Sequence, residues 1–282
     1  MKIKNILIRN FLHPIANYIY KNKFLNKRFK NLLFLLDLRL VPFFSNSFDD
    51  IYEKIYHKND KLIIFDVGGN TGQSIIRFKS LFKNSKIYTF EPIPELCKNI
   101  SLNFKNQEIQ VYNLALSNKN GDSNLYVTAN KGASSFYKIN TNSQIISSLS
   151  KKLNVPSEKW IEKEIKIQTK KLDDFCNESK IDKIDILKID TQGAEKLVLE
   201  GSENILSNQK IDIVELEINI GFLYNQNNST FTDIEKYLLK YNYKFLGLEN
   251  NPGRSKNLIF NKELEFDLVY VSDSLFKKLN LK

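Results

Sequence analysis

The sequence predicts an α/β fold built on a mostly parallel, Rossmann-like sheet. Leu62 to Phe65 form a continuous apolar run, which is typical of a strand covered on both faces of a parallel sheet. The glycine-rich segment 68–72 follows at once, and glycine lets the backbone adopt positive φ and approach a ligand closely. Glu91 ends the next expected strand, about 20 residues further on, where nucleotide-binding α/β folds hold a ribose. We therefore expect a ligand that contains a nucleoside.

The glycine turn indicates which nucleoside it is. Residues 68–72 read GGNTG, which does not match the G-x-G-x-x-G pattern of dinucleotide sites, and the chain contains no G-x-x-x-x-G-K-[ST] phosphate loop. Asp66 leads the turn, and its carboxylate would repel a phosphate but suits a cation. S-adenosylmethionine has a ribose, an amino-acid tail and a positive sulfonium, so these residues favour it over NAD. The alternative is that Gly68 and Gly72 only form a tight turn between strand and helix.

The first half of the chain alternates helix and strand. Ser47 can cap a short entry helix that has acidic residues in its first turn. A second helix over 74–82 follows the glycine turn, and Pro94 begins a third, because proline is tolerated at the first helical position. A strand over 109–116 and a turn over 118–121 come next. In the second helix, the side chains expected to face the sheet are Ile75, Ile76, Phe78 and Phe82.

Residues 122–170 form an insertion that interrupts this alternation. Two stretches, 125–127 and 165–169, alternate like partly exposed strands, and residues 145–153 between them are helix-like. Ligands of open α/β sheets bind beyond the carboxyl ends of the strands. The insertion therefore either walls the ligand site or is a peripheral elaboration.

The alternation returns after the insertion. We expect a strand over 184–189, a helix over 196–206 and a strand over 211–218. Thr230 or Thr232 can cap the next helix, which runs to Tyr241. Two final strands, 243–248 and 266–272, are expected to close the sheet as an antiparallel pair.

Composition limits the cellular context. The chain has 42 basic and 32 acidic residues, and its net charge of +10 favours anionic partners such as nucleic acid, acidic glycans or a membrane surface. Cys97 and Cys176 are the only cysteines, too few for a disulfide framework or a zinc site, which suits the reducing cytoplasm. No apolar run approaches the roughly 20 residues that span a bilayer. We expect a cytoplasmic protein.

The first 58 residues are predicted to form a basic helical region ahead of a catalytic domain over 59–282. Residues 1–36 contain eight Lys and Arg and no Asp or Glu. Apolar side chains recur there at helical spacing, at Leu25, Phe29, Leu32, Leu33, Leu36 and Leu40. Such a helix can lie on the inner face of the membrane, or it can pack on the sheet or on a second subunit of an oligomer. A signal peptide is not expected, because Asp37 and Arg39 interrupt the apolar stretch.

Six motifs stand in order along the chain: DVGGNTG (66–72), EPIP (91–94), NLALS (113–117) with Gly121, GASS (132–135), KLDDF (171–175) and DILKIDTQGAE (185–195). By these motifs, over roughly residues 60 to 272, the chain resembles the FkbM-type S-adenosylmethionine-dependent methyltransferases. The resemblance implies a Rossmann-like class I methyltransferase sheet, mostly parallel with an antiparallel last strand. It also implies a hydroxyl acceptor, often on a sugar or a secondary metabolite. One departure is Gly69, where the family more often has alanine.

Position in these motifs predicts the cofactor contacts. The amino-acid tail and the sulfonium are expected at Asp66, Gly68, Gly69, Asn70 and Gly72. Glu91 and the adjacent Pro92 are expected at the ribose. The adenine is expected along Asn113, Ala115, Leu116 and Ser117.

Methyl transfer to a hydroxyl also needs a group that takes the proton. Histidine is the usual base, but His13 and His57 are the only histidines and both precede the cofactor-binding segment. A carboxylate is therefore the expected base.

Four residues on or shortly after the strands expected over 184–189 and 211–218 are the catalytic candidates. Asp190 ends this strand beside the expected cofactor, and Lys188 is either its ion-pair partner or a group that orients substrate. Glu195 begins the next helix, where it is either catalytic or a partner of the helix dipole. Glu217 shares one strand face with Glu215, either towards substrate or within an ion pair.

Magnesium is a further candidate component. A carboxylate near its ordinary pKa of about 4 is a weak base for an alcohol, unless burial raises that pKa or a divalent metal acidifies the alcohol. Asp190, Glu217 and Asn219 could supply oxygen ligands for Mg²⁺.

These observations predict an O-methyltransferase that acts on a hydroxyl of a sugar, glycan or lipid-linked saccharide. A small secondary metabolite is the alternative acceptor. A nucleic-acid methyltransferase suits the net charge, but the Asn/Asp-Pro-Pro-Tyr/Phe motif of base-modifying enzymes is absent. A non-catalytic binding protein on the same fold is the remaining alternative.

Overall fold

The computed structural model describes residues 48–105, 108–143, 146–147, 150–151, 155–220, 224–225, 229–250 and 264–279. Most of the expected basic N-terminal region and part of the helix expected over 145–153 lie outside these ranges. Within them, no helix combines the length and the apolar character needed to cross a bilayer.

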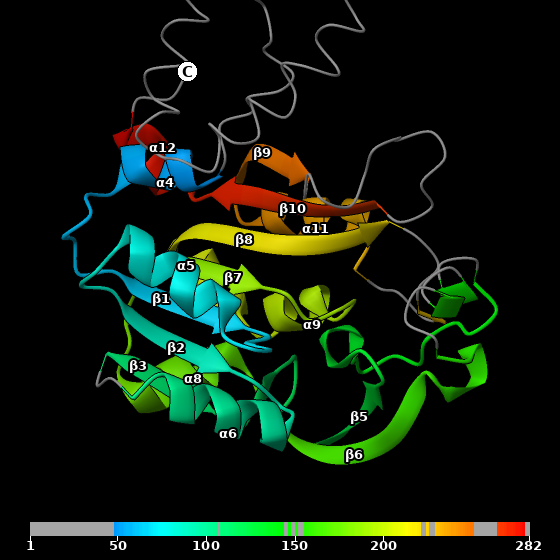
Figure 1. Cartoon of the computed structure of the whole chain (residues 1–282). Helices are drawn as coiled ribbons and strands as arrows, with labels where there is room; N and C mark the ends of the chain where they lie inside the picture. Colours follow the sequence, from blue (N-terminus) through cyan, green and yellow to red (C-terminus); the bar gives the residue numbers. More distant parts are fainter. Residues whose placement is uncertain are drawn as a thin grey trace, which may run out of the picture. The chain divides into compact units, whose positions relative to one another are not determined.

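A seven-stranded sheet with helices on both faces forms the centre of this part of the chain (Figure 1). Its strand order is β3-β2-β1-β7-β8-β10-β9. The pairs from β3 to β8 are parallel, and β10 is antiparallel to both β8 and β9, as predicted. The strands are β1 (Ile63–Val67), β2 (Lys86–Phe90), β3 (Ile109–Tyr112), β7 (Ile184–Ile189), β8 (Ile211–Ile220), β9 (Lys244–Asn250) and β10 (Leu264–Val271).

The helices bury the two faces of the sheet in two separate cores. Successive strand residues point to opposite faces, so Ile64 joins one core and Phe65 the other. This double burial explains the uninterrupted apolar run of β1. The core that contains Ile64 is covered by α4 (Phe48–Ile55), α5 (Gln73–Leu81), α6 (Pro94–Asn103) and α12 (Asp273–Lys278). The core that contains Phe65 is covered by α8 (Leu172–Ser179), α9 (Glu195–Glu200), α10 (Glu203–Ser207) and α11 (Phe231–Lys240), whose N-cap is Thr230.

The insertion forms a second, three-stranded sheet of order β4-β6-β5. It consists of β4 (Ala115–Leu116), β5 (Gly121–Thr128) and β6 (Ile161–Lys170), with short 3₁₀ turns η3 (Lys131–Ala133) and η4 (Ser157–Lys159). β5 and β6 pair antiparallel and contain the two strands predicted in this region. They lie beyond the carboxyl ends of β1 and β2 (Figure 1).

Three local predictions are wrong. Ile76 is 62 % exposed, because α5 faces the sheet only through the side that carries Ile75 and Phe78. The strand expected over 109–116 divides into β3 and β4, since the chain leaves the main sheet and pairs with β6. The helix expected over 196–206 is broken into α9 and α10 around Gly201, where a Cβ would lie 2.0 Å from the carbonyl oxygen of Ser117.

Buried charges cross the sheet on the α5 face. Asp66, Lys188 and Glu215 stand side by side in register on β1, β7 and β8. Arg77 of α5 covers them, with Nη1 2.5 Å from Glu215 Oε1, and the Tyr52 hydroxyl donates to Glu215 Oε2 at 2.7 Å. Burial raises the pKa of Glu215, but the Arg77 charge and hydrogen bond outweigh it and bring the pKa below its ordinary value. The ion pair therefore ties α4 and α5 to the sheet.

We expect Arg77→Met to lower the free energy of unfolding by about 3 kcal/mol, because Glu215 would remain buried without its cation. Urea unfolding followed by circular dichroism measures this change. The double variant Arg77→Met/Glu215→Gln should recover part of the loss. The partly exposed surface pair Lys196–Glu200 offers a control, since Lys196→Met should change stability by less than about 0.5 kcal/mol. A loss in Arg77→Met no larger than in this control would contradict the role of the ion pair.

Candidate functional site

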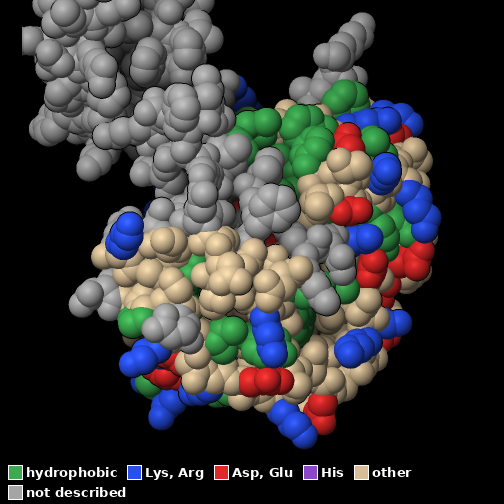
Figure 2. Space-filling view, turned by 90° about the vertical axis from the view of Figure 1, so that its right-hand side faces the viewer, with side chains coloured by type: hydrophobic (Ala, Val, Ile, Leu, Met, Phe, Trp, Pro, Cys, Tyr) green, Lys and Arg blue, Asp and Glu red, His purple; other side chains and the backbone are tan. Residues whose placement is uncertain are grey.

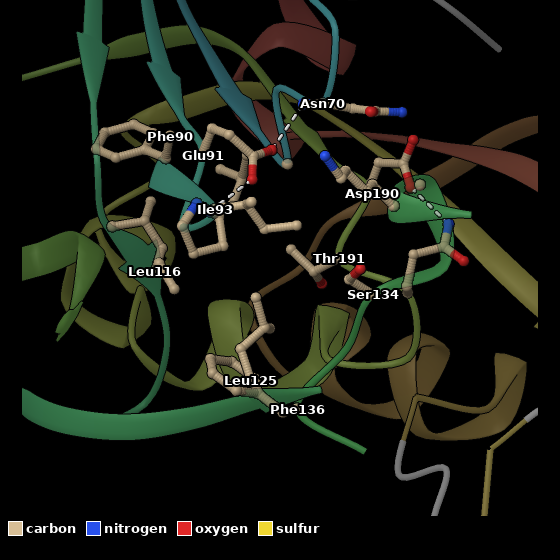
Figure 3. Close-up of a pocket in the computed structure, with 17 residues that line it drawn as sticks. Asn70, Phe90, Glu91, Ile93, Leu116, Leu125, Ser134, Phe136, Asp190 and Thr191 are labelled. Carbon is tan, nitrogen blue, oxygen red and sulfur yellow. Dashed lines mark hydrogen bonds between the residues drawn. The ribbon is translucent and has the colours of Figure 1, made fainter. Parts of the chain in front are cut away.

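A cavity of about 630 Å³, including its mouth, lies at the carboxyl ends of β1, β2 and β7 (Figure 3). Gly68 and Asn70 line it from the glycine turn, Glu91 from the end of β2 and Asp190 from the end of β7. The insertion supplies the facing wall, through Leu125 and the segment 131–136. Sites for small ligands commonly enclose roughly 300–1,000 Å³.

Close packing explains the glycines of the turn. Gly68 has φ +93°, and a Cβ there would lie 1.9 Å from the carbonyl oxygen of Asp190. Gly72 has φ +87° and lies against the ring of Phe104. At Gly69 the methyl group of Thr89 occupies the space that a Cβ would need, at 2.3 Å. This chain therefore accommodates glycine rather than alanine at position 69.

Glu91 lines the cavity directly after the end of β2. Its Oε2 accepts a hydrogen bond from the backbone N–H of Asn70 at 2.7 Å, and its Oε1 accepts one from the N–H of Ile93 at 2.8 Å (Figure 3). Burial raises the pKa of Glu91 to about 7, although the two N–H donors oppose the shift. Each oxygen keeps a free lone pair, so the carboxylate can still accept hydroxyl groups.

Asp66 is fully buried beneath the glycine turn, and it does not line the cavity. Its Oδ2 lies 3.4 Å from the Thr89 hydroxyl, and its Oδ1 has no hydrogen-bond partner within the described ranges. Burial raises the pKa of this carboxyl group, and the nearby Lys188 lowers it. A buried carboxyl oxygen without a partner is costly, so the site favours a cation or a donor nearby.

The lower part of the cavity is apolar. Leu116, Leu125 and Phe136 lie together below Glu91 (Figure 3), and Pro92 and Ala115 also line the cavity. These side chains form a surface suited to a flat base.

Two predicted adenine contacts do not line the cavity. The Asn113 side chain donates to the carbonyl oxygens of Glu91 and Pro92, at 2.9 Å each. Ser117 is buried, and its backbone N–H donates to the carbonyl of Lys170. Both therefore support the strands around the cavity.

The four predicted catalytic residues divide into two groups. Asp190 lines the cavity, and Lys188 Nζ lies 3.2 Å from its Oδ2. Although burial lowers the pKa of Lys188, the surrounding carboxylates, Asp190 first, raise it above its ordinary value. Glu195 is buried outside the cavity lining, and its Oε1 accepts hydrogen bonds from the Thr191 hydroxyl and from the backbone of the turn after β7. Glu217 also lies outside the lining, and its Oε1 accepts a hydrogen bond from Gln192, which lines the cavity.

Gln192 is a residue whose part in the site could not be deduced from its sequence position. Its Nε2 lies 3.0 Å from Asp190 Oδ1 and 2.9 Å from Glu217 Oε1. The GASS motif gave a signal for the insertion wall, since Gly132 and Ser134 line the cavity. No pattern marked Leu125 or Phe136.

The structure gives no support to the magnesium prediction. No group of three or more His, Cys, Asp or Glu is arranged to hold a metal ion in the ranges that the structure describes. The side chain of Asn219 lies outside the described part. His57 is exposed and lies outside the cavity lining, and His13 falls in the undescribed N-terminal region.

The fold and the site together define a Rossmann-like class I S-adenosylmethionine-dependent methyltransferase. The features that define this class here are the strand order, the glycine turn after β1 and the carboxylate after β2. A family model described as the methyltransferase FkbM domain matches residues 66–245. The chain belongs to the FkbM methyltransferase family.

Individual relatives are more distant. The chain is 26 % identical over 157 residues to 2-O-methyltransferase NoeI of Sinorhizobium fredii, a match that covers 54 % of this chain and 62 % of that protein. It is 27 % identical over 165 residues to Methyltransferase 1 of Beauveria bassiana, covering 55 % and 64 %. The chain thus spans less than two thirds of the length of both relatives.

Solved methyltransferases align over most of the chain with low similarity. A putative S-adenosylmethionine-dependent methyltransferase from Listeria monocytogenes gives a TM-score of 0.44 at 6 % identity, covering 78 % of this chain and 94 % of that one. Precorrin-6y C5,15-methyltransferase from Geobacter metallireducens gives 0.41 at 12 % identity, covering 79 % and 87 %.

We expect S-adenosylhomocysteine to bind about tenfold more weakly for each pH unit below 7, because protonated Glu91 cannot accept both ribose hydroxyls. Glu91→Gln should weaken binding about 10- to 100-fold at pH 8 and remove the pH dependence. Isothermal titration calorimetry between pH 5.5 and 8 measures both effects. Glu217→Gln, whose carboxyl group lies outside the cavity lining, should keep the wild-type pH dependence. Unchanged affinity in Glu91→Gln would exclude Glu91 from the ribose site.

Proposed function

We propose that this protein transfers the methyl group of S-adenosylmethionine to a hydroxyl group of a saccharide. The observation that carries the proposal is that Glu91 and Asp190 line one cavity. One carboxylate can hold the ribose of the cofactor while the other faces the acceptor. The name of the relative 2-O-methyltransferase NoeI supports an oxygen acceptor.

The residues of the cavity fit the cofactor part by part. Glu91 would accept the ribose hydroxyls, and Leu116, Leu125 and Phe136 would contact the adenine. The backbone after Gly68 would contact the amino-acid tail. The unpartnered Oδ1 of Asp66 would add a favourable negative charge beneath the positive groups.

The proposed chemistry is a direct displacement. When bound, S-adenosylmethionine supplies a methyl carbon on a positive sulfur; the acceptor oxygen bonds to this carbon as its bond to sulfur breaks. Asp190 would accept the hydroxyl proton, and Lys188 would hold the Asp190 carboxylate towards the acceptor. The cavity walls would align the two reactants, which is the main contribution available to such a reaction. The products are a methyl ether and S-adenosylhomocysteine.

The charge distribution favours a saccharide over nucleic acid. Residues 1–47 contain nine of the 42 basic residues and one of the 32 acidic residues, so the remaining chain is nearly neutral. On the side towards the carboxyl ends of the parallel strands, blue and red side chains are interspersed around the periphery (Figure 2). Nucleic-acid sites usually concentrate Lys and Arg on one face. A small hydroxylated metabolite remains the second candidate, and a lipid-linked saccharide at the membrane stays a prediction from the basic segment 1–36.

We expect the protein to transfer a labelled methyl group from S-adenosylmethionine to a glycan fraction of its own cells. Asp190→Asn should lower kcat about 100-fold or more, because the amide cannot take the proton, while S-adenosylhomocysteine affinity stays within about threefold. Scintillation counting of fractionated products gives the rate, and calorimetry gives the affinity.

Asp122→Asn on β5 is the matched control, since Asp122 is exposed and outside the cavity lining, and its rate should match the wild type. Label that appears only in nucleic acid or in small metabolites would overturn the saccharide assignment. Full activity of Asp190→Asn would exclude Asp190 as the base.

A further inference from the structure

The turn after β7 has a backbone conformation that a non-glycine residue rarely adopts. Gln192 has φ +55°, and Gly193 follows with φ +97°. Such strain persists only where surrounding contacts hold it. Ser135 Oγ donates to the Gln192 carbonyl oxygen at 2.7 Å, and Glu195 Oε1 accepts from the N–H groups of Thr191 at 3.1 Å and Gly193 at 3.0 Å. The insertion and α9 therefore hold the turn from two sides.

This conformation places the Gln192 side chain between two carboxylates. Its Nε2 donates to Asp190 Oδ1 at 3.0 Å and to Glu217 Oε1 at 2.9 Å. Its Oε1 lies 3.1 Å from the Tyr224 hydroxyl, whose single proton is shared between this oxygen and the Ala133 carbonyl oxygen, also at 3.1 Å. Both amide hydrogens and the amide oxygen are used. The reverse orientation would turn the amide oxygen towards Asp190 Oδ1 and remove that hydrogen bond, so the contact with Asp190 selects one orientation.

We propose that Gln192 is a positioning residue that fixes the Asp190 carboxylate towards the acceptor hydroxyl and separates it from Glu217. This inference rests on the proposed function of Asp190. Lys188 Nζ contacts Asp190 Oδ2 and Gln192 Nε2 contacts Oδ1, so each oxygen of the carboxylate has one protein donor. Rotation of the carboxylate would break both hydrogen bonds. The remaining lone pairs of the fixed carboxylate are available to the acceptor.

An amide suits this position better than an apolar or acidic side chain. Burial, Asp190 and Asp267 raise the pKa of Glu217 to about 8, while Lys188 and the hydrogen bond from Gln192 lower it. Loss of the amide donor should therefore raise the pKa of Glu217 further. The titratable groups that interact electrostatically with Asp190 or Glu217 are Asp66, Glu91, Lys188, Glu195, Tyr224 and Asp267.

The test compares Gln192→Leu with Gln168→Leu in the full chain. Gln168 is an exposed residue of β6 that donates to Asp122, so its replacement removes a glutamine of the same size away from the cavity. We expect Gln192→Leu to lower kcat at least about tenfold, with the KM for S-adenosylmethionine within about threefold. The acidic limb of its kcat–pH profile should move up by about one unit, because Glu217 loses a hydrogen-bond donor and holds its proton to a higher pH. Gln168→Leu should match the wild type in all three measurements.

A second variant and a second measurement keep the inference testable if Gln192→Leu does not fold. Tyr224→Phe removes the hydroxyl that contacts both the Gln192 amide oxygen and the Ala133 carbonyl oxygen, and it should shift the pH profile in the same direction by a smaller amount. Titration of ¹³C-labelled carboxyl groups by NMR should show a raised Glu217 pKa in either variant, whether or not an acceptor is known. An unchanged kcat with an unchanged pH limb would overturn the role of Gln192, as would an unchanged Glu217 titration. Failure of the wild type to methylate any saccharide would instead overturn the proposed function.

Discussion

The site depends on the close approach of two backbone segments, Gly68 and the carbonyl of Asp190. The Asp190 N–H donates to the Val67 carbonyl, so the β1–β7 ladder continues to the point where both strands end. Because no side chain fits between Gly68 and Asp190, the glycine turn and the end of β7 open into the same cavity. Backbone geometry therefore makes the two parts of the cavity, the proposed cofactor site at the glycine turn and the proposed acceptor site at Asp190, adjacent.

The electrostatics of this region differ from those of the whole chain. The chain carries a net charge of +10, yet carboxyl groups dominate the carboxyl-end edge of the central strands. Burial raises the pKa of Glu91 and Asp267 to about 7 and that of Glu217 to about 8. Lys188 is a buried cation among them. A ligand with a positive sulfur and several hydroxyl donors satisfies such a site better than an anion does.

Much of the fold could be predicted from the sequence because its signals are local. The apolar run of β1, the glycine turn and Glu91 each depend on neighbours within a few residues, and the structure has each in the expected element. The break at Gly201 and the exposure of Ile76 depend instead on which segment packs against them.

The same distinction applies to the site. Asp190 could be placed because it directly follows a predicted strand. Sequence position alone could not distinguish the roles of Glu195 and Glu217 from that of Asp190. The three-dimensional contacts do so, because Glu195 accepts hydrogen bonds from the turn after β7 and Glu217 accepts one from Gln192. The wall formed by Leu125 and Phe136 depends on how the insertion folds back over the sheet.

The wall of the cavity has an evolutionary consequence. The segment after β5 is joined to the chain beyond β8 by the Ile139–Tyr224 bridge and by the hydrogen bond from the Asn225 N–H to the Lys138 carbonyl. These links do not involve β1, β2 or the glycine turn. Substitutions around these links can alter the acceptor side of the proposed site in related proteins, as long as Leu125 and Phe136, the proposed adenine contacts in the same wall, are kept.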